Sequence, residues 1–409
     1  MSEINVVNNN ETNPVEIVGT DDLGENIYSI EKWDELKISD SLLRGIYGYG
    51  FEKPSEIQKK SIAPIIDGRD IIAQAQSGMG KTGAFSIGTL QRIDVSQPMI
   101  QAILLAPTHE LVKQTQKVIQ ALGSHIEGLK VKTLIGGTSI QEDAQDIRDN
   151  CPHIIVGCAG RVYDMFRRRY INGRSIKIMV LDEADVMLSS GFKEQIYNLF
   201  QYLNEDIQVS IFSATLPPDI LVLTEKFMRN PVKITMAAEK LNLECITQYY
   251  IAVRHDNDKF DVLKDLFSFI SLSQCIIYCN SVRRVSDLYQ SMIADGFSVC
   301  CIHSSMDRVE RDREFQEFRS GKYRVLISSN VTARGIDIQQ VSTVINFDIP
   351  KDEHTYLHRI GRSGRWGRKG MAINFVTKFD IQNMKRIENY YKINIQELPA
   401  NFSLDPMDT

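Results

Sequence analysis

RDIIAQAQSGMGKTGAFSIGTLQRI, Arg69 to Ile93, joins a short apolar run to a helix-like segment through a glycine-rich loop. Small residues let the backbone of this loop wrap an anion, and the N–H groups at the helix start favour negative charge. Lys81 adds a cation that reaches the β and γ phosphates of a nucleotide, and the Thr82 hydroxyl would bind Mg²⁺. The alternative is a loop that merely turns the chain. The strand before it and the helix after it favour a phosphate loop, although Ala75 stands where the pattern usually has Gly.

Strand-like runs alternate with helix-like segments from this point onward, and most of the runs are apolar on both faces. The runs are QAILLAPT, KVKTLIGG, HIIVGCA, IKIMVLD and VSIFSAT, followed after residue 245 by TQYYIAV, QCIIYCN, SVCCIHS, YRVLISS, TVINFDI and MAINFVT. Such runs joined by helices predict parallel sheets covered by helices on both faces. The restart after residue 245 predicts two α/β domains in tandem.

Length and composition agree with this division. A chain of 409 residues exceeds the size at which one core stops growing, so two domains are expected. We place a disordered acidic tail at 1–25, a first domain at 26–236, a linker at 237–245 and a second domain at 246–409. No run approaches the ~20 apolar residues of a membrane span, and no secretory signal opens the chain. The protein is therefore expected in the cytoplasm, with the nucleus as the alternative.

The cysteines and the charge exclude some classes of protein. Seven scattered cysteines argue against a disulfide framework, and the pairs Cys275/Cys279 and Cys300/Cys301 lack the convergent histidines of a zinc site. The net charge of −5 would argue against nucleic acid as a partner. However, the first 31 residues hold seven acids and no Lys or Arg, so the remaining chain has a net charge of +2. The net charge therefore does not exclude a local basic groove.

VLDEADVML, Val180 to Leu188, places three carboxylates directly after an apolar strand. Asp182 falls at the carboxyl end of that strand, where open parallel sheets bind ligands, and can hold Mg²⁺ beside the phosphate loop. Glu183 is then available to orient and deprotonate the attacking water. A solvated acidic turn is the alternative, but it does not explain why these acids follow an apolar strand in a chain that carries GKT.

At this point the chain resembles the DEAD-box RNA helicases, over residues from about Trp33 to Gly370. GFEKPSEIQ at 50–58 looks like the family's Q motif. Further motifs follow in the family's order: APTHEL at 106–111, GG at 136–137, AGR at 159–161, DEAD at 182–185, SAT at 213–215, IIYCNS at 276–281, ARGID at 333–337 and HRIGRSGRWGRKG at 358–370. The resemblance implies two tandem RecA-like domains, with ATP and Mg²⁺ as cofactors.

The resemblance also implies the ATP-binding residues. Gln58 would read the adenine edge, and Trp33 would stack on the base. Asp337 is expected near the ribose. The full expected set is Trp33, Gln58, Ala75, Gln76, Ser77, Gly78, Met79, Gly80, Lys81, Thr82, Gly335 and Asp337.

The remaining motifs imply closure of one domain on the other. In the family, Arg362 and Arg365 reach the γ-phosphate from the second domain, so hydrolysis should require closure. ATP and RNA would then favour the same closed state and bind cooperatively. A coupling network is expected from Asp185, Ser213, Thr215 and His358. The implied RNA contacts are Pro107, Thr108, Gly136, Gly137, Arg161, Arg311 and Ser329. These suit single-stranded or short-duplex RNA held without base reading.

The clear losses from the family pattern all fall on the RNA face. His109 replaces a permanent cation and could make RNA affinity depend on pH. Cys158 and Ala159 replace Thr-Pro. Ser304, Arg308 and Asn330 stand where Gly, Gln and Asp are usual.

Two functions follow. The first is an ATP-dependent helicase that bends and locally unwinds mRNA in translation initiation, as a monomer with a scaffold protein. SLLRGIYGYGFEKPSEIQ is similar to the initiation factor 4A branch of the family. The second is an ATP-gated RNA clamp in mRNA processing, splicing or export with weak unwinding. Met79, which gives SGMGKT, makes the phosphate loop similar to that of the helicases of mRNA export and splicing, and the altered RNA face favours a clamp.

Overall fold

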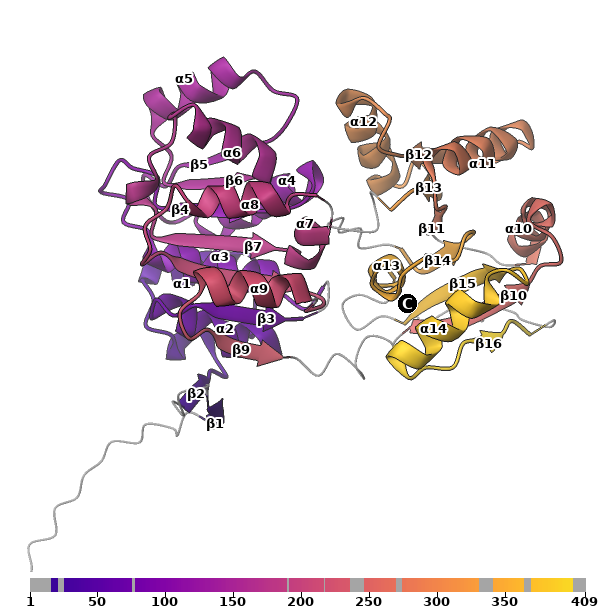
Figure 1. The fold of residues 1–409 in the computed structure, drawn as a ribbon, viewed down its shortest axis with the longest axis horizontal. Coiled ribbons are helices and arrows are strands. Elements are labelled where there is room, and N and C mark those ends of the chain that lie inside the picture. Colours follow the sequence, from indigo (N-terminus) through magenta and orange to yellow (C-terminus); the bar gives the residue numbers. More distant parts are fainter. Residues whose placement is uncertain are drawn as a thin grey trace, which may run out of the picture.

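The computed structural model describes residues 16–20, 26–75, 78–189, 191–216, 218–235, 246–269, 274–330, 341–363 and 369–399. Two seven-stranded sheets, both wholly parallel, form the two halves of the molecule (Figure 1). The predicted tandem α/β architecture is thereby confirmed. The predicted linker at 237–245 lies outside the described residues.

The first sheet has the strand order β5-β6-β4-β7-β8-β3-β9. Its strands are β3 (Ile71–Gln74), β4 (Ala102–Leu105), β5 (Val131–Leu134), β6 (Ile154–Gly157), β7 (Ile178–Asp182), β8 (Gln208–Ser213) and β9 (Val232–Thr235). The helices of this half are α1 (Asp40–Gly48), α2 (Glu56–Ile66), α3 (Lys81–Arg92), α4 (His109–Leu122), α5 (Ile140–Asn150), α6 (Ala159–Arg167), α7 (Ala184–Ser189), α8 (Lys193–Phe200) and α9 (Pro218–Phe227), with 3-10 turns at Trp33–Glu35 and Gly173–Ser175.

The second sheet has the order β12-β13-β11-β14-β15-β10-β16. Its strands are β10 (Ile246–Ala252), β11 (Cys275–Tyr278), β12 (Val299–Ile302), β13 (Val325–Ser328), β14 (Thr343–Asn346), β15 (Gly370–Val376) and β16 (Gln396–Glu397). Its helices are α10 (Lys259–Phe269), α11 (Val282–Ala294), α12 (Arg308–Arg319), α13 (Glu353–Ile360) and α14 (Ile381–Tyr391), with a 3-10 turn at Asp256–Asp258.

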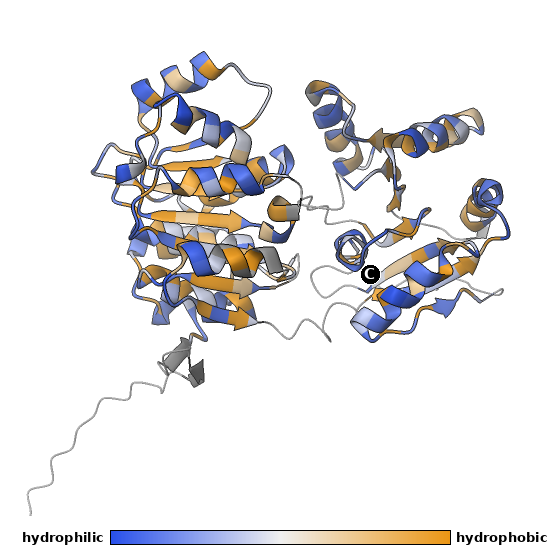
Figure 2. Ribbon diagram, in the orientation of Figure 1, coloured by the Kyte–Doolittle hydropathy of each residue, from blue (hydrophilic) through white to orange (hydrophobic). Residues whose placement is uncertain are grey.

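The core lies on both faces of each sheet, as apolar runs on both faces require. Every residue of β4, β6, β7 and β8 is buried, and Figure 2 shows the strands as the most hydrophobic elements beneath helices with hydrophilic outer faces. Within the described residues, no helix is both long and apolar enough to cross a bilayer. The strands of the first sheet end on the side that faces the second half (Figure 1), so residues just after these strands lie between the domains.

A hairpin precedes the first domain and corrects part of the predicted tail. Residues 1–25 are predicted to be disordered, yet Glu16–Thr20 forms strand β1, paired antiparallel with β2 (Asn26–Ser29). The pairing uses backbone groups, so a polar and acidic composition does not prevent it. The other residues of the predicted tail, 1–15 and 21–25, lie outside the described ones.

Candidate nucleotide site and RNA face

The phosphate loop connects β3 to α3, and the lysine at its end bonds back to the residue at its start. Gly78 and Gly80 have φ of +86° and +95°, a left-handed conformation that favours glycine. The Lys81 ammonium is buried and donates to the carbonyl of Ala75 at 2.7 Å. Lys81 also begins α3, so the helix N-terminus and this cation lie together, as anion binding requires. Gln76 and Ser77, predicted members of the loop, lie outside the described residues.

The start of α2 holds the phosphate loop from the side. The Ser55 hydroxyl donates to the carbonyl of Met79 at 2.8 Å, and the Gln58 amide donates to the carbonyl of Gly80 at 3.2 Å. The same Gln58 side chain accepts from the Ser55 N–H, which completes a capping box. Gln58 therefore lies next to the phosphate loop, where its amide fixes the loop conformation.

The prediction that Trp33 stacks on adenine needs correction. Its ring is fully buried, its indole N–H donates to the carbonyl of Phe51 at 2.9 Å, and it stacks on the Phe51 ring at 6.2 Å between centroids. A buried ring offers no face to a ligand. Phe51 is only half-buried and lies beside Gln58, since a Cβ added to Gly83 would meet both side chains within 3 Å. Phe51 is thus a second aromatic candidate for this site, which the sequence analysis did not name although it stands inside the quoted Q motif.

The acidic cluster occupies the end of β7, between the phosphate loop and the second domain. Asp182 and Glu183 are both buried, and the Asp182 carboxylate accepts the Glu183 N–H at 2.9 Å. Glu183 has φ of +49°, a conformation that costs a residue with a side chain about 1–3 kcal/mol. Such strain is typical of functional positions, where the surrounding packing enforces it.

Asp182 fits a divalent cation. Burial raises the pKa of Asp182 to about 7, the Lys81 ammonium opposes this effect, and the Glu183 carboxylate adds to it. A buried carboxylate with so high a pKa lacks sufficient positive charge in the protein itself, and an oxygen-ligated cation would supply it. Thr82, the second residue of α3, is half-buried in the same loop-to-helix segment.

The raised pKa of Asp182 predicts a pH-dependent gain in stability for Asp182→Asn. The folded-state pKa of about 7 exceeds the ordinary value of 3.8, so stability from this group is lost as the pH rises from about 4 to 7. At pH 8 without nucleotide or metal, Asn should therefore raise the unfolding free energy of the first domain by up to ~4 kcal/mol, at ~1.4 kcal/mol per pKa unit. At pH 4.5 the gain should largely vanish. Thermal or urea unfolding at both pH values checks this, and an equal effect at both would contradict the raised pKa.

The predicted coupling residues meet across the two domains. Asp185 accepts from the Thr215 hydroxyl at 2.8 Å and its N–H donates to the Ser213 hydroxyl at 3.3 Å. His358, on α13 of the second domain, places Nε2 3.5 Å from the same Asp185 carboxylate. Burial alone would raise the pKa of Asp185, but the hydrogen bond and charge of His358 hold it well below its usual value. All four side chains are buried.

Arg362 follows α13 directly and is also buried. Its Nε donates to the carbonyl of His358 at 3.2 Å, so the side chain shares the turn that carries the Asp185 contact. The other predicted residues of this side, Arg365, Gly335 and Asp337, lie outside the described residues.

Three of the five predicted RNA residues of the first domain, Pro107, Gly136 and Arg161, line one cavity of about 380 Å³. Its lining consists of Pro107, His109, Gly136, Cys158, Gly160, Arg161, Asp164 and Phe192. Thr108 caps α4 by accepting the Leu111 N–H, and Gly137 has a left-handed φ of +82°. Ser329 lies on the second domain just after β13, where its N–H donates to the carbonyl of Ile302 at 3.4 Å.

Both arginines predicted for RNA are already paired with carboxylates. Arg161 forms a buried ion pair with Asp143 and donates to the Thr138 hydroxyl at 2.8 Å. Arg311 lies 3.0 Å from Glu110 of the first domain. The sequence motifs do not reveal these partners, which reduce the positive charge that the RNA face presents.

The departures from the family pattern have local structural consequences. Cys158 occupies the N-cap of α6 without a side-chain cap bond, so the position lacks the hydrogen bond that a Thr hydroxyl could supply. Burial raises the pKa of the Cys158 thiol to about 12. Ala159 and Arg308 begin α6 and α12, and Ser304 lies in the exposed turn after β12. Asn330 accepts two hydrogen bonds from the buried Arg359 guanidinium.

Restoring a permanent cation at position 109 should strengthen RNA binding. His109 lines the RNA-face cavity and lies against Gly136. With His109→Arg, we expect RNA affinity to rise severalfold and the slope of log affinity against log salt to steepen by about 0.7, the value for one phosphate contact on a single strand. Fluorescence titrations of labelled RNA at several salt concentrations measure both quantities. An unchanged slope would show that the departure is neutral.

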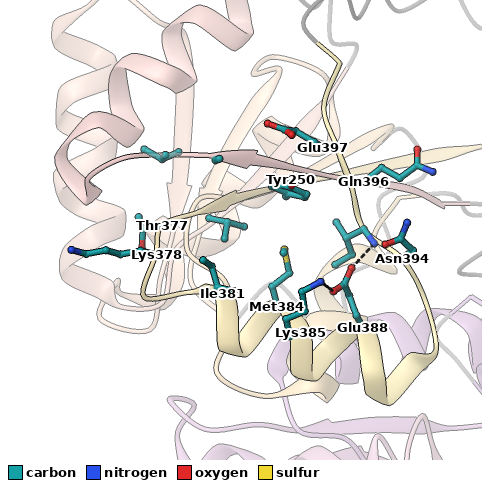
Figure 3. A pocket seen from close by; sticks show the side chains of 14 residues that line it. Tyr250, Thr377, Lys378, Ile381, Met384, Lys385, Glu388, Asn394, Gln396 and Glu397 are labelled. Atoms are coloured by element: carbon teal, nitrogen blue, oxygen red, sulfur yellow. Dashed lines mark hydrogen bonds and ion pairs between the residues drawn. The ribbon is translucent and has the colours of Figure 1, made fainter.

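A larger cavity of about 670 Å³ lies on the second domain, and Figure 3 shows the side chains that line it. It is bounded by α14 and by the neighbouring strands β10, β15 and β16. Lys385 pairs with Glu388, which also accepts the Ile395 N–H. Among the described residues of its lining, none belongs to the predicted ATP, RNA or coupling sets.

Comparisons with known proteins agree with this geometry. Residues 55–222 match the family described as DEAD/DEAH box helicase, and residues 258–367 match the helicase conserved C-terminal domain. The chain is 48% identical to "Eukaryotic initiation factor 4A" of Caenorhabditis elegans, over 96% of this chain and 98% of that protein. It is 51% identical to "ATP-dependent RNA helicase eIF4A" of Saccharomyces cerevisiae, over 91% of this chain and 94% of that protein.

A solved structure extends the likeness to the arrangement of both domains. The structure of Saccharomyces cerevisiae Dbp5 bound to RNA and ADP BeF3 superposes with a TM-score of 0.84 at 36% identity, covering 91% of this chain and 96% of that one. Both helicase domains and nearly the whole length are therefore shared with these proteins, and the chain belongs to the DEAD-box helicases of the initiation factor 4A type.

Proposed function

We propose that ATP binding closes the two domains of this protein on RNA, which bends and locally unwinds the RNA without reading its sequence, and that hydrolysis of ATP follows closure. One contact carries the proposal: His358 of the second domain meets Asp185 at the end of the first sheet, 3.5 Å apart and fully enclosed. That contact joins the nucleotide half of the site to the helix that carries Arg362.

The residues of the chain would divide the chemistry of hydrolysis. Gln58 and Phe51 hold the base, and the phosphate loop with Lys81 holds the phosphates. Glu183 orients the attacking water and accepts its proton. Arg362 stabilises negative charge that develops on the transferred phosphoryl group, together with Arg365 in the same role. Gly335 and Asp337 would contact the nucleotide from the second domain.

Asp182 and Thr82 would hold Mg²⁺. The cation would neutralise charge on the β and γ phosphates when it is bound with ATP. The raised pKa of the buried Asp182 carboxyl supports this assignment, because a neighbouring cation stabilises its ionised form.

RNA would lie across the faces that hold Pro107, Gly136 and Ser329. Backbone groups and small side chains dominate there, since Arg161 and Arg311 are paired with carboxylates. Such a face contacts phosphates and 2′-hydroxyls, which carry no sequence information. Dbp5, which shares this fold, was solved bound to RNA, and this supports RNA as a partner here.

The biological role that we propose is remodelling of mRNA in translation initiation. Relatives that are named as initiation factor 4A match this chain over nearly their full length. Their names support this role and a cytoplasmic location. A scaffold protein would assist a bare two-domain core, and the protein would act as a monomer.

A paired assay tests the proposal. RNA-stimulated ATP hydrolysis and the release of a strand from a short duplex are measured on the same preparation. We expect RNA to stimulate hydrolysis and strands to separate only with ATP. No RNA stimulation would contradict the proposal as a whole.

The rival function, an ATP-gated RNA clamp, is favoured by the ion pairs that join the domains beside the RNA face. Rapid hydrolysis without strand release would support the clamp over the helicase. Long-lived RNA binding with a non-hydrolysable ATP analogue is common to both, so strand release decides between them.

A further inference from the structure

Two ion pairs join α4 of the first domain to α12 of the second. Glu110 lies 3.0 Å from Arg311, and Lys113 lies 2.5 Å from Asp312. We call these four residues the α4–α12 latch. Figure 1 shows α4 and α12 on the facing sides of the two domains.

The order of charges fixes how the two helices meet. Glu110 and Lys113 are three residues apart on α4, so they project from one helix face about a turn apart. Arg311 and Asp312 lie in the first turns of α12. An acid and a base on α4 thus face a base and an acid on α12. A displacement that brought Glu110 to Asp312 would place like charges together, so the latch specifies one alignment.

The two pairs differ in their surroundings. The Glu110 and Arg311 side chains are 10% and 16% exposed, and both belong to motifs that line the RNA face. Lys113 and Asp312 are each 36% exposed and lie outside the predicted RNA, ATP and coupling sets. The outer pair can therefore be changed without removing a residue that the motifs assign to a ligand.

We propose that Lys113 and Asp312 are positioning residues for RNA binding: their ion pair stabilises the closed arrangement and sets Arg311 at the RNA face. The proposal rests on the proposed function, because it assumes that RNA binds the closed state. A partly exposed ion pair that exists only in that state shifts the balance of closed to open roughly two- to fivefold. RNA affinity should change by the same factor when ATP is bound.

Asp312→Lys distinguishes an effect of the latch on RNA binding from an effect of ordinary charge attraction, because the two predict opposite changes in affinity. The substitution removes a negative charge and adds a positive one, a change of +2 beside the RNA face. Attraction to phosphates alone would therefore tighten RNA binding. Loss of the latch, with repulsion between two lysines and Arg311, should instead weaken RNA binding roughly three- to tenfold with a non-hydrolysable ATP analogue. Without nucleotide, when the domains are not held together, the affinity should stay equal or rise.

The same variant should change the RNA concentration needed for hydrolysis much more than the maximal rate of hydrolysis. At saturating ATP, the RNA concentration for half-maximal hydrolysis should rise about three- to tenfold, in step with the lost affinity, while kcat at saturating RNA changes less than twofold. Asp312→Glu keeps the charge and should restore both values.

A charge swap and a matched control complete the experiment. Lys113→Asp combined with Asp312→Lys restores opposite charges across the helices and should return RNA affinity to within about twofold of the original, as an interaction between contacting residues requires. Lys117→Asp makes the same charge change as Lys113→Asp one turn further along α4, at an exposed position, and should have the smaller effect.

Two outcomes would overturn the proposal: tighter RNA binding by Asp312→Lys with the ATP analogue, or a swap no better than its single variants. Either result with normal RNA stimulation of the unmodified protein refutes the latch alone. Absence of RNA stimulation in the unmodified protein refutes the proposed function instead.

Discussion

Glu183→Gln should reduce ATP hydrolysis by about 10²–10⁴-fold, the usual contribution of a general base, and leave ATP binding intact. Glu183 is buried at the end of β7 beside Asp182, between the phosphate loop and the second domain. Gln matches Glu in shape, so it meets the same left-handed backbone at φ of +49°. It cannot accept a proton from water at neutral pH. Single-turnover hydrolysis with saturating RNA measures the chemical step directly.

A measurement of ATP binding shows whether the loss of hydrolysis arises in the chemical step rather than in nucleotide affinity. A fluorescent ATP analogue should bind Glu183→Gln within about threefold of the original affinity, because the phosphate loop and Gln58 are untouched. Glu194→Gln, the same change at an exposed position of α8, serves as the matched control and should alter neither quantity. Hydrolysis reduced less than tenfold in Glu183→Gln would remove Glu183 from the role of base.

The sheets and the phosphate loop could be predicted because local sequence determines them. Runs that are apolar on both faces have one stable environment, a sheet covered on both sides, and all of the quoted runs became strands. Asp185 and Thr215 follow the adjacent strands β7 and β8, and Ser213 ends β8, so their meeting follows from strand order. Short edge strands such as β9 and β16 were not predicted, since few residues carry too weak a pattern.

The partners of the functional side chains were less predictable. Trp33 and Phe51 are both aromatic residues near the Q motif, and only packing determines that Trp33 is buried while Phe51 lies beside Gln58. Arg161 and Arg311 read as RNA contacts from their motifs, yet Asp143 and Glu110 pair with them. Glu110 belongs to the opposite domain from Arg311. Tertiary contacts between distant segments decide such pairings, and neither periodicity nor spacing reports them.

Removing Arg362 should produce an equally large loss through the opposite half of the site. Arg362 is held by the carbonyl of His358, whose imidazole contacts Asp185, so closure of the domains brings this guanidinium and the acidic cluster into one enclosure. Its charge is absent from the site when the domains separate. We expect Arg362→Ala to lower single-turnover hydrolysis about 10³-fold or more, as the loss of an arginine finger does, with ATP affinity nearly unchanged.

Arg362→Lys distinguishes the geometry of this charge from its presence. Lysine keeps the positive charge but lacks the planar fork of donors, so hydrolysis should fall between those of the original and Arg362→Ala. Arg319→Ala, at the exposed end of α12, is the matched control and should hydrolyse ATP normally. Because Arg362 is buried, thermal unfolding of each variant must show an intact second domain. If Arg362→Ala folds and retains more than a tenth of the rate, the charge that completes the site comes from elsewhere, and Arg365 becomes the residue to test.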